Sequence, residues 1–374
     1  GTGAMGRGIA QMAAQAGATV WLFDAQPGAA DAARAALEGT WNSLVAKQRM
    51  ATEAAADCLS RLRIATGMTD LAACDLVVEA IVERLEIKQK VFAELEGIVG
   101  PEAVLATNTS SLSVTAIGAA LKRPERFAGW HFFNPVPLMK VVEVIAGLKT
   151  DAAVCQRLDA FARAFGHTPV MAQDTPGFIV NHAGRGYGTE ALRIVGESVS
   201  DFATIDRILK DQLGFRLGPF ELMDLTALDV SHPVMESIYH QYFEEPRYRP
   251  SVITAQRLAG GVVGKKVGEG FYRYADGKPE LPAEPPVPAG AARPPVWVSP
   301  KAARRAELYQ LLKDLGAVIE TAAAPSAEAL ILVAPLGLDV TTLAAVERLD
   351  ATRTVGIDMM LEDAAVKRRV LATN

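Results

Sequence analysis

Residues 1–17 read GTGAMGRGIAQMAAQAG, a glycine-rich turn that runs straight into an Ala-rich helical segment. Each glycine of this G-x-G-x-x-G pattern has a separate physical task. Gly1 permits a tight turn, Gly3 lets the backbone approach a pyrophosphate, and Gly6 allows the helix to pack closely on a strand. Glycine-rich turns before helices are common, so the pattern is weak by itself. It favours a dinucleotide-binding α/β domain of the Rossmann type.

The residues after the glycines indicate which dinucleotide the loop would bind. The helix starts near Ala4 and Met5, where unpaired N–H groups and the helix dipole favour a phosphate. ATVWLFD (18–24) is typical of a strand and ends at Asp24, where a carboxylate can accept both ribose hydroxyls. The next two residues are Ala and Gln, so no arginine follows that would accept a 2′-phosphate. NAD is therefore favoured over NADP; a structural turn with a helix-capping Asp is the alternative.

Residues 1–174 alternate short β-branched runs with amphipathic helical stretches, which is typical of parallel βαβ units in a sheet covered on both faces. We expect strands at 18–24, 75–82, 103–108, 127–134, 140–146 and 167–173. In such a sheet the strand before the glycine loop is central. Because that strand is missing before Gly1, we expect the sequence to be a piece of a longer protein.

The pattern changes after residue 174. Helical periodicity with Gly and Pro corners predicts an all-helical domain over 175–275. A Pro-rich linker is expected at 276–295, followed by a small Rossmann-like module at 296–374 that we expect to be incomplete. The predicted fold class is an α/β NAD-binding domain lacking its first strand, then a helical domain and a small α/β module.

Composition narrows the function classes. Apolar residues make up 50% of the 374 residues and the net charge is −5 without a long basic run, so nucleic acid is a poor candidate partner. Three scattered cysteines, Cys58, Cys74 and Cys155, have no metal-ligand spacing and are typical of a reducing compartment. The sequence has no apolar run near ~20 residues and no signal-peptide pattern. We expect a cytoplasmic protein without membrane or metal partners.

Two residues in neighbouring strands carry the predicted chemistry. His131 lies in the aromatic run FAGWHFFN, and Glu143 lies among valines in KVVEVIA. A carboxylate buried in an apolar strand needs a partner, and the short connection can bring it to His131. A histidine paired in this way has a fixed tautomer and raised basicity, as a general base needs. The alternative is a satisfied core histidine.

Polar residues near these two strands are candidates for substrate or cofactor contacts. Asn108, Ser110 and Ser111 lie between a strand and a helix; we expect Ser111 to cap the helix and Ser110 to donate to a substrate oxygen. Asn108 is assigned to the cofactor site. Asn181 follows DTPGFIV and can close the site from the helical side, although a buried Asn satisfied by backbone is nearly as good an interpretation.

The chain resembles the 3-hydroxyacyl-CoA dehydrogenases. The matching motifs span residues 1–275 in the family's order and are GTGAMGRGIAQ, DLVVEAIVE, TNTSSLSVT, RFAGWHFFNPVPLMKVVEVI, DTPGFIVN, GPFELMDL and KKVGEGFY. The resemblance implies NAD-dependent oxidation of (S)-3-hydroxyacyl-CoA to 3-ketoacyl-CoA. His131 would be the base and Glu143 would orient it, while Ser110 and Asn181 would hold substrate oxygens.

The resemblance also implies further contacts. Glu83 and Lys88 fall where the family contacts the cofactor. Ser43, Lys47 and Arg49 lie near the position of the family's CoA-binding arm, although a solvated helix face explains them equally well. The family dimerises through its helical domain, so a homodimer is expected.

The acyl chain stays open between 3-hydroxybutyryl-CoA and 3-hydroxyadipyl-CoA. The tail beyond 275 is similar to that of longer bacterial members, including those of phenylacetate catabolism. This resemblance slightly favours 3-hydroxyadipyl-CoA. Two other functions compete. A β-hydroxyacid dehydrogenase acting on a free acid would need a catalytic Lys in the helical domain, and none is compelling. A catalytically silent NAD-binding scaffold is the other alternative.

Overall fold

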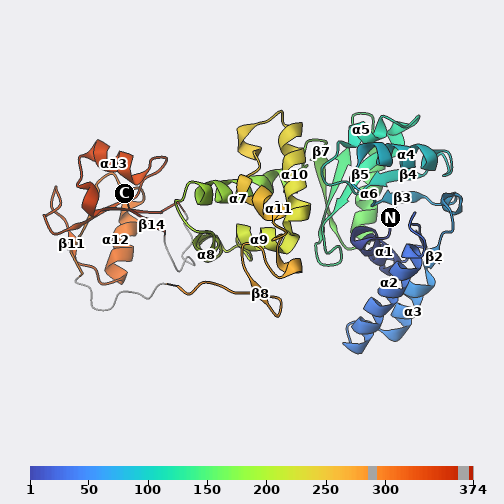
Figure 1. Cartoon of the computed structure of the whole chain (residues 1–374), viewed down its shortest axis with the longest axis horizontal. Coiled ribbons are helices and arrows are strands. Elements are labelled where there is room, and N and C mark those ends of the chain that lie inside the picture. The colour runs from blue at the N-terminus through green and yellow to red at the C-terminus, as the bar shows by residue number, and fades with distance from the viewer. Residues whose placement is uncertain (285–292, 361–369, 374) are drawn as a thin grey trace. The chain divides into compact units, whose positions relative to one another are not determined.

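The computed structural model describes residues 1–284, 293–360 and 370–373 (Figure 1). The chain divides into two compact units, one formed by residues 1–189 and 233–250 and the other by residues 190–232 and 251–374. Each unit is described by itself below.

The first unit contains seven strands in two sheets. A two-stranded parallel sheet pairs β1 with β2, and a five-stranded sheet has the order β3-β4-β5-β6-β7. The strands are β1 Val20–Leu22, β2 Leu62–Ile64, β3 Leu76–Glu79, β4 Val104–Thr107, β5 Phe127–Phe132, β6 Val141–Ala146 and β7 Thr168–Gln173. The helices are α1 Ala4–Gln15, α2 Ala29–Ala46, α3 Thr52–Ser60, α4 Leu85–Glu96, α5 Val114–Gly118 and α6 Ala152–Ala164, with 3₁₀ turns at Met68–Leu71 and Pro124–Arg126.

Every strand expected in 1–174 is present, although each is shorter than expected, and β2 was not expected. One pairing departs from the predicted parallel pattern, because β5 and β6 are antiparallel. A parallel connection needs a dozen or more residues, and only residues 133–140 join these two strands. The short turn therefore reverses the chain.

The larger sheet has an apolar cluster on each face. One face packs on α1 and α6 through residues such as Ile9, Trp130 and Leu158. The opposite face packs on α4 and α5 through Phe92 and Val114. The alternation of side chains along a strand means that His131 and Glu143 point to the side of α4 and α5. The sheet is thus covered on both faces and buries the two residues predicted to carry the chemistry.

Gly1 lies at the carboxyl ends of β1 and β3. Its amino group donates to the carbonyl oxygen of Phe23, directly after β1, and a side chain at Gly1 would collide with the backbone of Ala80, directly after β3. A side chain at Gly6 would collide with the carbonyl oxygen of Gly1. The glycines therefore permit the close approach of loop, helix and strand ends that the motif predicts.

Helices α2 and α3 lie side by side as a hairpin at one end of the first unit (Figure 1). They bury Leu37, Trp41 and Cys58 against β1, β2 and the outer side of α1. The turn of the hairpin, residues 47–51, is mostly exposed.

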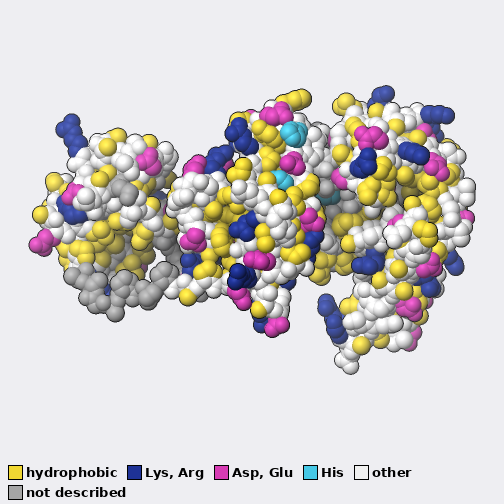
Figure 2. Space-filling model, in the orientation of Figure 1, with side chains coloured by type: hydrophobic (Ala, Val, Ile, Leu, Met, Phe, Trp, Pro, Cys, Tyr) yellow, Lys and Arg dark blue, Asp and Glu magenta, His cyan; other side chains and the backbone are white. Residues whose placement is uncertain are grey.

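Charged side chains of both signs are scattered over the surface visible in Figure 2.

The second unit combines helices with the small C-terminal sheet. Helices α7 Val180–Gly196 and α10 Leu228–Gln241 cross the boundary between the units, and a 3₁₀ turn at Pro246–Tyr248 belongs to the first. The remaining helical elements are α8 Phe202–Leu213, α9 Pro219–Thr226, α11 Val252–Ala259 and a 3₁₀ turn at Lys265–Val267. The segment expected to be all-helical ends in a strand, β8 Tyr274–Ala275, which pairs with β9 Lys278–Pro279 inside the expected linker. The linker residues 285–292 lie outside the described residues.

Two buried carboxylates hold this helical region together. Asp206 accepts hydrogen bonds from two backbone N–H groups at the start of α9 and from the hydroxyl of Tyr272. Asp224 accepts from the backbone N–H groups of Phe271 and Tyr272. Side chains at Gly218 and Gly270 would collide with these carboxylates. The motifs GPFELMDL and KKVGEGFY are therefore packing and capping signals.

The C-terminal module is a five-stranded sheet of order β11-β10-β12-β13-β14 with the first four strands parallel. Its elements are β10 Val296–Val298, α12 Arg305–Asp314, β11 Ile319–Glu320, β12 Leu330–Val333, α13 Val340–Glu347, a 3₁₀ turn at Ala351–Arg353, β13 Thr354–Ile357 and β14 Leu371–Ala372. This is the strand–helix alternation that the sequence predicts for 296–374; residues 361–369 lie outside the described residues.

Candidate active site

His131 and Glu143 face each other across directly paired positions of β5 and β6. Nδ1 of His131 lies 2.6 Å from Oε2 of Glu143, and the two residues are 4% and 1% exposed. The rings of Phe133 and Phe178 lie 4.5 Å and 5.7 Å from the imidazole, measured between ring centres. The antiparallel pairing of β5 and β6 thus brings the predicted histidine and carboxylate together, with aromatic rings around the imidazole.

The second oxygen of Glu143 is also bound. Oε1 accepts hydrogen bonds of 2.9 Å from the backbone N–H groups of Ile179 and Val180, at the start of α7. Burial raises the pKa of Glu143, but the hydrogen bonds from His131 and from these N–H groups outweigh burial and hold the pKa below its usual value. Glu143 is therefore a carboxylate at neutral pH.

A carboxylate on Nδ1 fixes the tautomer of His131. The ring carries its hydrogen on Nδ1, which donates to Glu143, and Nε2 is left as an acceptor. Nε2 makes no hydrogen bond with any residue in the described part of the chain. The arrangement can accept a proton from a bound hydroxyl group and stabilise the imidazolium that results.

Ser110 and Asn181 meet beside this pair. Nδ2 of Asn181, in the first turn of α7, donates to the backbone carbonyl of Ser110 at 3.3 Å. The start of α7 thus binds Glu143 through backbone N–H groups and also carries Asn181. Through Asn181 it contacts Ser110 as well. Both Ser110 and Asn181 are partly exposed and can face a substrate.

Glu83 organises the loop that carries Ser110. Its Oε1 accepts from the hydroxyl of Thr109 and from the backbone N–H groups of Ser110 and Ser111, at 2.5, 2.8 and 3.1 Å. Burial raises the pKa of Glu83, and the ammonium of Lys88 together with these hydrogen bonds lowers it below its usual value. The structure therefore shows Glu83 bracing the loop that carries Ser110, and its predicted contact with the cofactor stays a prediction.

Lys88 is not an exposed cation available to a cofactor. Its side chain is 1% exposed, and its ammonium lies 2.6 Å from Glu79 and 3.2 Å from Glu83. Two carboxylates occupy this ammonium, and the predicted contact of Lys88 with the cofactor stays a prediction. Lys88 instead neutralises the two acids that hold the ends of β3 and the loop after β4.

The prediction that Ser111 caps the next helix is wrong. Helix α5 begins at Val114, and its cap is Ser113, whose hydroxyl accepts from the N–H of Ala116. Ser111 is buried and donates through its N–H and its hydroxyl to Glu83. The prediction chose the wrong serine, since Ser110, Ser111 and Ser113 all lie shortly before the helix in the sequence.

Asn108 joins the two strands that flank the site. Its side-chain oxygen accepts from the N–H of Phe132, and its own N–H donates to the carbonyl of Glu79, both at 2.8 Å. Asn108 therefore ties the ends of β3, β4 and β5 together. Its predicted contact with the cofactor stays a prediction.

The glycine loop and Asp24 fit a dinucleotide. Helix α1 begins at Ala4 with Gly3 as its cap, has no acidic residue in its first turn, and a methyl group at Gly3 would meet no protein atom within 4 Å. Asp24 accepts from the N–H and hydroxyl of Thr2 and from the N–H of Gln26. Both bonds from Thr2 fall on Oδ2, whereas Oδ1 accepts only from Gln26 and keeps a further lone pair for a ribose hydroxyl. Open space, helix N–H groups and a fixed carboxylate suit a pyrophosphate and a ribose.

The predicted CoA contacts lie together at the far end of the α2–α3 hairpin. Ser43 is on the last turn of α2, and Lys47 and Arg49 follow it directly; all three are exposed. The structure therefore groups them on one accessible surface.

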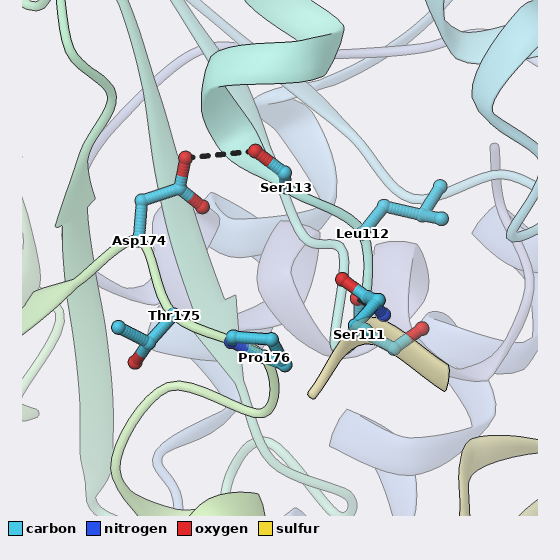
Figure 3. A pocket seen from close by; sticks show the side chains of 7 residues that line it. Ser111, Leu112, Ser113, Asp174, Thr175 and Pro176 are labelled. Atoms are coloured by element: carbon cyan, nitrogen blue, oxygen red, sulfur yellow. Dashed lines mark hydrogen bonds between the residues drawn. The ribbon is translucent and has the colours of Figure 1, made fainter. Parts of the chain in front are cut away.

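A small cavity of about 140 Å³ opens beside the Ser111 loop (Figure 3). It is lined by Ser111, Leu112, Ser113, Asp174, Thr175, Pro176 and Gln241. Asp174 accepts from the hydroxyl of Ser113 and from two N–H groups of α5, and Gln241 donates to the carbonyl of Ser111. These groups fix the segment from Ser111 to the start of α5.

Sequence reasoning missed four of these supporting residues, namely Thr2, Thr109, Asp174 and Gln241. Only Asp174 has a local signal, because DTPGF follows a predicted strand.

Among the described residues, no group of three or more His, Cys, Asp or Glu side chains is placed to hold a metal. In the same part of the chain, every helix is too short or too polar to span a bilayer.

Comparison with known families shows to which family this chain belongs. Residues 1–175 match the model of the 3-hydroxyacyl-CoA dehydrogenase NAD-binding domain, and residues 177–274 match that of the 3-hydroxyacyl-CoA dehydrogenase C-terminal domain. This chain belongs to the 3-hydroxyacyl-CoA dehydrogenase family. Its first domain binds NAD, and the chain is an NAD-dependent oxidoreductase of that family. The family and fold class predicted from the motifs are confirmed.

Several dehydrogenases are similar to this family member. It is 43% identical over 274 residues to 3-hydroxyadipyl-CoA dehydrogenase of Escherichia coli, covering 73% of this chain and 58% of that protein. The chain thus spans little more than half of that relative. It is 40% identical to a probable 3-hydroxybutyryl-CoA dehydrogenase of Deinococcus radiodurans, covering 73% of this chain and 98% of the other. The crystal structure of an E. coli 3-hydroxybutyryl-CoA dehydrogenase matches with a TM-score of 0.84 at 36% identity, covering 100% of this dehydrogenase and 73% of that chain.

Proposed function

We propose that this chain catalyses the NAD-dependent oxidation of (S)-3-hydroxyacyl-CoA to 3-ketoacyl-CoA, with His131 as the general base. The observation that carries this proposal is the 2.6 Å contact between Nδ1 of His131 and Glu143. This contact leaves Nε2 of His131 as a hydrogen-bond acceptor and places the negative charge of Glu143 next to Nδ1. Such a histidine can take the proton of the substrate's hydroxyl group as the C–H bond breaks.

The other site residues have distinct proposed tasks. Glu143 orients the imidazole and stabilises its charged form. Ser110 and Asn181, which meet at 3.3 Å, would hold the oxygens of the substrate. Glu83 holds the Ser110 loop, and Asp174 holds the start of α5 that follows it. Fixed geometry of this kind lowers the entropic part of the barrier.

The cofactor would lie on the glycine loop. Gly1, Gly3 and Gly6 allow the close approach of its pyrophosphate, N–H groups from Ala4 and Met5 onward face the phosphates, and Asp24 binds the ribose. Bound NAD⁺ supplies the hydride acceptor.

For the substrate, we propose that Ser43, Lys47 and Arg49 contact the phosphates of CoA. The acyl group is that of 3-hydroxybutyryl-CoA or 3-hydroxyadipyl-CoA, in fatty-acid or phenylacetate degradation.

We propose 1–174 as the NAD-binding domain, 175–275 as the substrate and dimerisation domain, 276–295 as a linker and 296–374 as a further module. The homodimer and the cytoplasmic location stay predictions.

A single assay tests the proposal. NADH oxidation is followed with acetoacetyl-CoA for the wild type, His131→Ala and Glu143→Gln, with His240→Ala as a matched control because its side chain is 67% exposed. We expect turnover by the wild type and by the control and a large loss in the two site variants. Absence of turnover with every 3-ketoacyl-CoA contradicts the function, and full activity of both site variants contradicts the residue roles. Reduction of free acetoacetate identifies a free-acid dehydrogenase instead, and NADH binding without any turnover identifies a scaffold.

A further inference from the structure

Arg185 is a charged residue near the proposed site that the reaction does not use. It lies in α7, four residues after Asn181, so the two side chains share one face of the helix. Its Nε donates to the carbonyl oxygen of Asn181 at 3.0 Å. This hydrogen bond holds the guanidinium alongside the first turn of α7, which also carries the N–H groups bound to Glu143. Along the helix axis, Arg185 is about 6 Å from Asn181.

The guanidinium of Arg185 has no acidic partner in the described part of the chain. Its two terminal nitrogens make no hydrogen bond there, and no Asp or Glu lies within ion-pair distance. Burial lowers the pKa of Arg185, with no nearby acid to raise it again. Because arginine stays charged in proteins, this charge is partly removed from water without compensation.

Other sheltered arginines of the chain are compensated by protein groups. Arg126 donates to the carbonyl oxygens of Glu96 and Gly100 at the end of α4. Arg257 donates to the carbonyl of Gly270 and stacks on a phenylalanine ring. Arg185 has a single backbone carbonyl on Nε, and the fork of terminal N–H groups that suits a carboxylate is left unused.

The face of α7 around Arg185 is bare. Gly184 and Gly188 lie on the same face as Asn181 and Arg185, at intervals of three and four residues. A methyl group added at either glycine would meet no protein atom within 4 Å. There is therefore open space beside the backbone between the residue proposed to hold a substrate oxygen and the guanidinium.

We propose that Arg185 binds a carboxylate at the far end of the acyl chain and so selects dicarboxylic 3-hydroxyacyl-CoA substrates. The assignment rests on the proposed function, because it takes the C3 hydroxyl to be at His131 and a substrate oxygen to be at Asn181. The acyl carbons beyond C3 run along the bare face of α7, and the terminal carboxylate accepts one N–H from each of the two terminal nitrogens of Arg185. A methyl-ended chain of the same length would leave the guanidinium without a partner.

The test compares two 3-ketoacyl-CoA substrates of equal length, 3-oxoadipyl-CoA and 3-oxohexanoyl-CoA, by NADH oxidation. For the wild type we expect the higher kcat/KM with the dicarboxylic substrate. Arg185→Met lowers the ratio of the two kcat/KM values by about 10- to 100-fold, the usual effect of losing a hydrogen-bonded charge pair. Arg185→Lys keeps part of the preference because the charge remains. Arg193→Met is the matched control, since Arg193 lies on the same helix, is exposed and pairs with Glu190; it leaves the ratio unchanged.

Several outcomes overturn the assignment. A wild type without preference for the dicarboxylic substrate overturns it, even if Arg185→Met fails to fold. An equal loss of kcat/KM with both substrates in Arg185→Met also overturns it. That result would mean that Arg185 binds a phosphate of CoA or only supports Asn181. Failure of the wild type to reduce either substrate contradicts the proposed function itself, and with it this assignment.

Discussion

His131 and Glu143 are direct neighbours in an antiparallel ladder, and their side chains meet at 2.6 Å on the face of the sheet that packs on α4 and α5. Two further N–H groups from α7 complete the coordination of the carboxylate. The pair is therefore positioned by backbone structure on both sides, and its consequences can be measured separately for catalysis and for stability.

The first prediction concerns catalysis. Glu143→Gln keeps the shape of the side chain but removes the negative charge that fixes the His131 tautomer. We expect kcat to fall by about 10³- to 10⁴-fold, as for other histidine–carboxylate pairs, with little change in the KM for NADH. Steady-state kinetics with acetoacetyl-CoA measures both. Glu94→Gln, at an exposed position of α4, is the control; a loss of less than tenfold for Glu143→Gln would contradict the role.

A second prediction follows from the lowered pKa of Glu143. Because the folded protein binds the proton of this group less tightly than the unfolded chain, the contribution of Glu143 to stability is present above its usual pKa of 4.5. That contribution is lost as the pH falls below 4.5 through the folded value. Urea unfolding at several pH values should show a smaller acid loss of stability for Glu143→Gln than for the wild type. Equal slopes for both proteins would be the contrary result.

Two glycines of the first loop should respond differently to alanine. A methyl group at Gly3 meets no protein atom, whereas one at Gly6 collides with the carbonyl of Gly1. We expect Gly3→Ala to keep the wild-type Tm while NAD binds less tightly, because the methyl group occupies the phosphate space. Gly6→Ala should lower Tm as well. Thermal unfolding and a cofactor titration distinguish them, and wild-type affinity in Gly3→Ala would argue against the placement of the pyrophosphate.

Lys88 should matter for stability more than for the cofactor. Lys88→Met leaves the carboxylates of Glu79 and Glu83 close together without a cation. Breaking a buried ion pair from one side costs about 3–5 kcal/mol in the free energy of unfolding. Chemical denaturation measures this cost, with Lys90→Met on the exposed side of the same helix as the control. Unchanged stability together with weak NAD binding would instead support the predicted contact of Lys88 with the cofactor.

The α2–α3 hairpin can be tested through the CoA moiety. The double variant Lys47→Gln, Arg49→Gln should raise the KM for acetoacetyl-CoA by roughly 3- to 10-fold, since exposed ion pairs are individually weak. It should not change the KM for acetoacetyl-pantetheine, which lacks the adenosine phosphates. Lys90→Gln serves as the surface-charge control. A similar change for both substrates would show that these residues do not contact the phosphates.

Much of the fold and part of the site could be predicted from local sequence. The glycine loop, the strand ending at Asp24 and the alternation over 1–174 are local patterns, because turn geometry and side-chain periodicity depend on neighbouring residues. His131 and Glu143 were predicted as a pair because a charged residue in an apolar strand needs a partner nearby.

Other features depend on segments that are distant in the chain. Lys88 has the sequence signature of a surface lysine, and only packing shows that Glu79 and Glu83 surround it. The cap of α5 is shifted from Ser111 to Ser113 because Asp174, some sixty residues away, binds that hydroxyl. No local pattern carries such information.

The sequence by itself determined the family, the order of the domains and the chemical types at the site, since these follow from motifs and from short-range periodicity. Tertiary structure decided which of those side chains share a proton, which are buried as structural ion pairs, and which are left without a partner. His131 gained Glu143 through the antiparallel register, whereas Arg185 was left with free N–H groups on the bare face of α7. The physical reason is that hydrogen bonding and desolvation depend on distances across the fold, and spacing along the chain does not fix them.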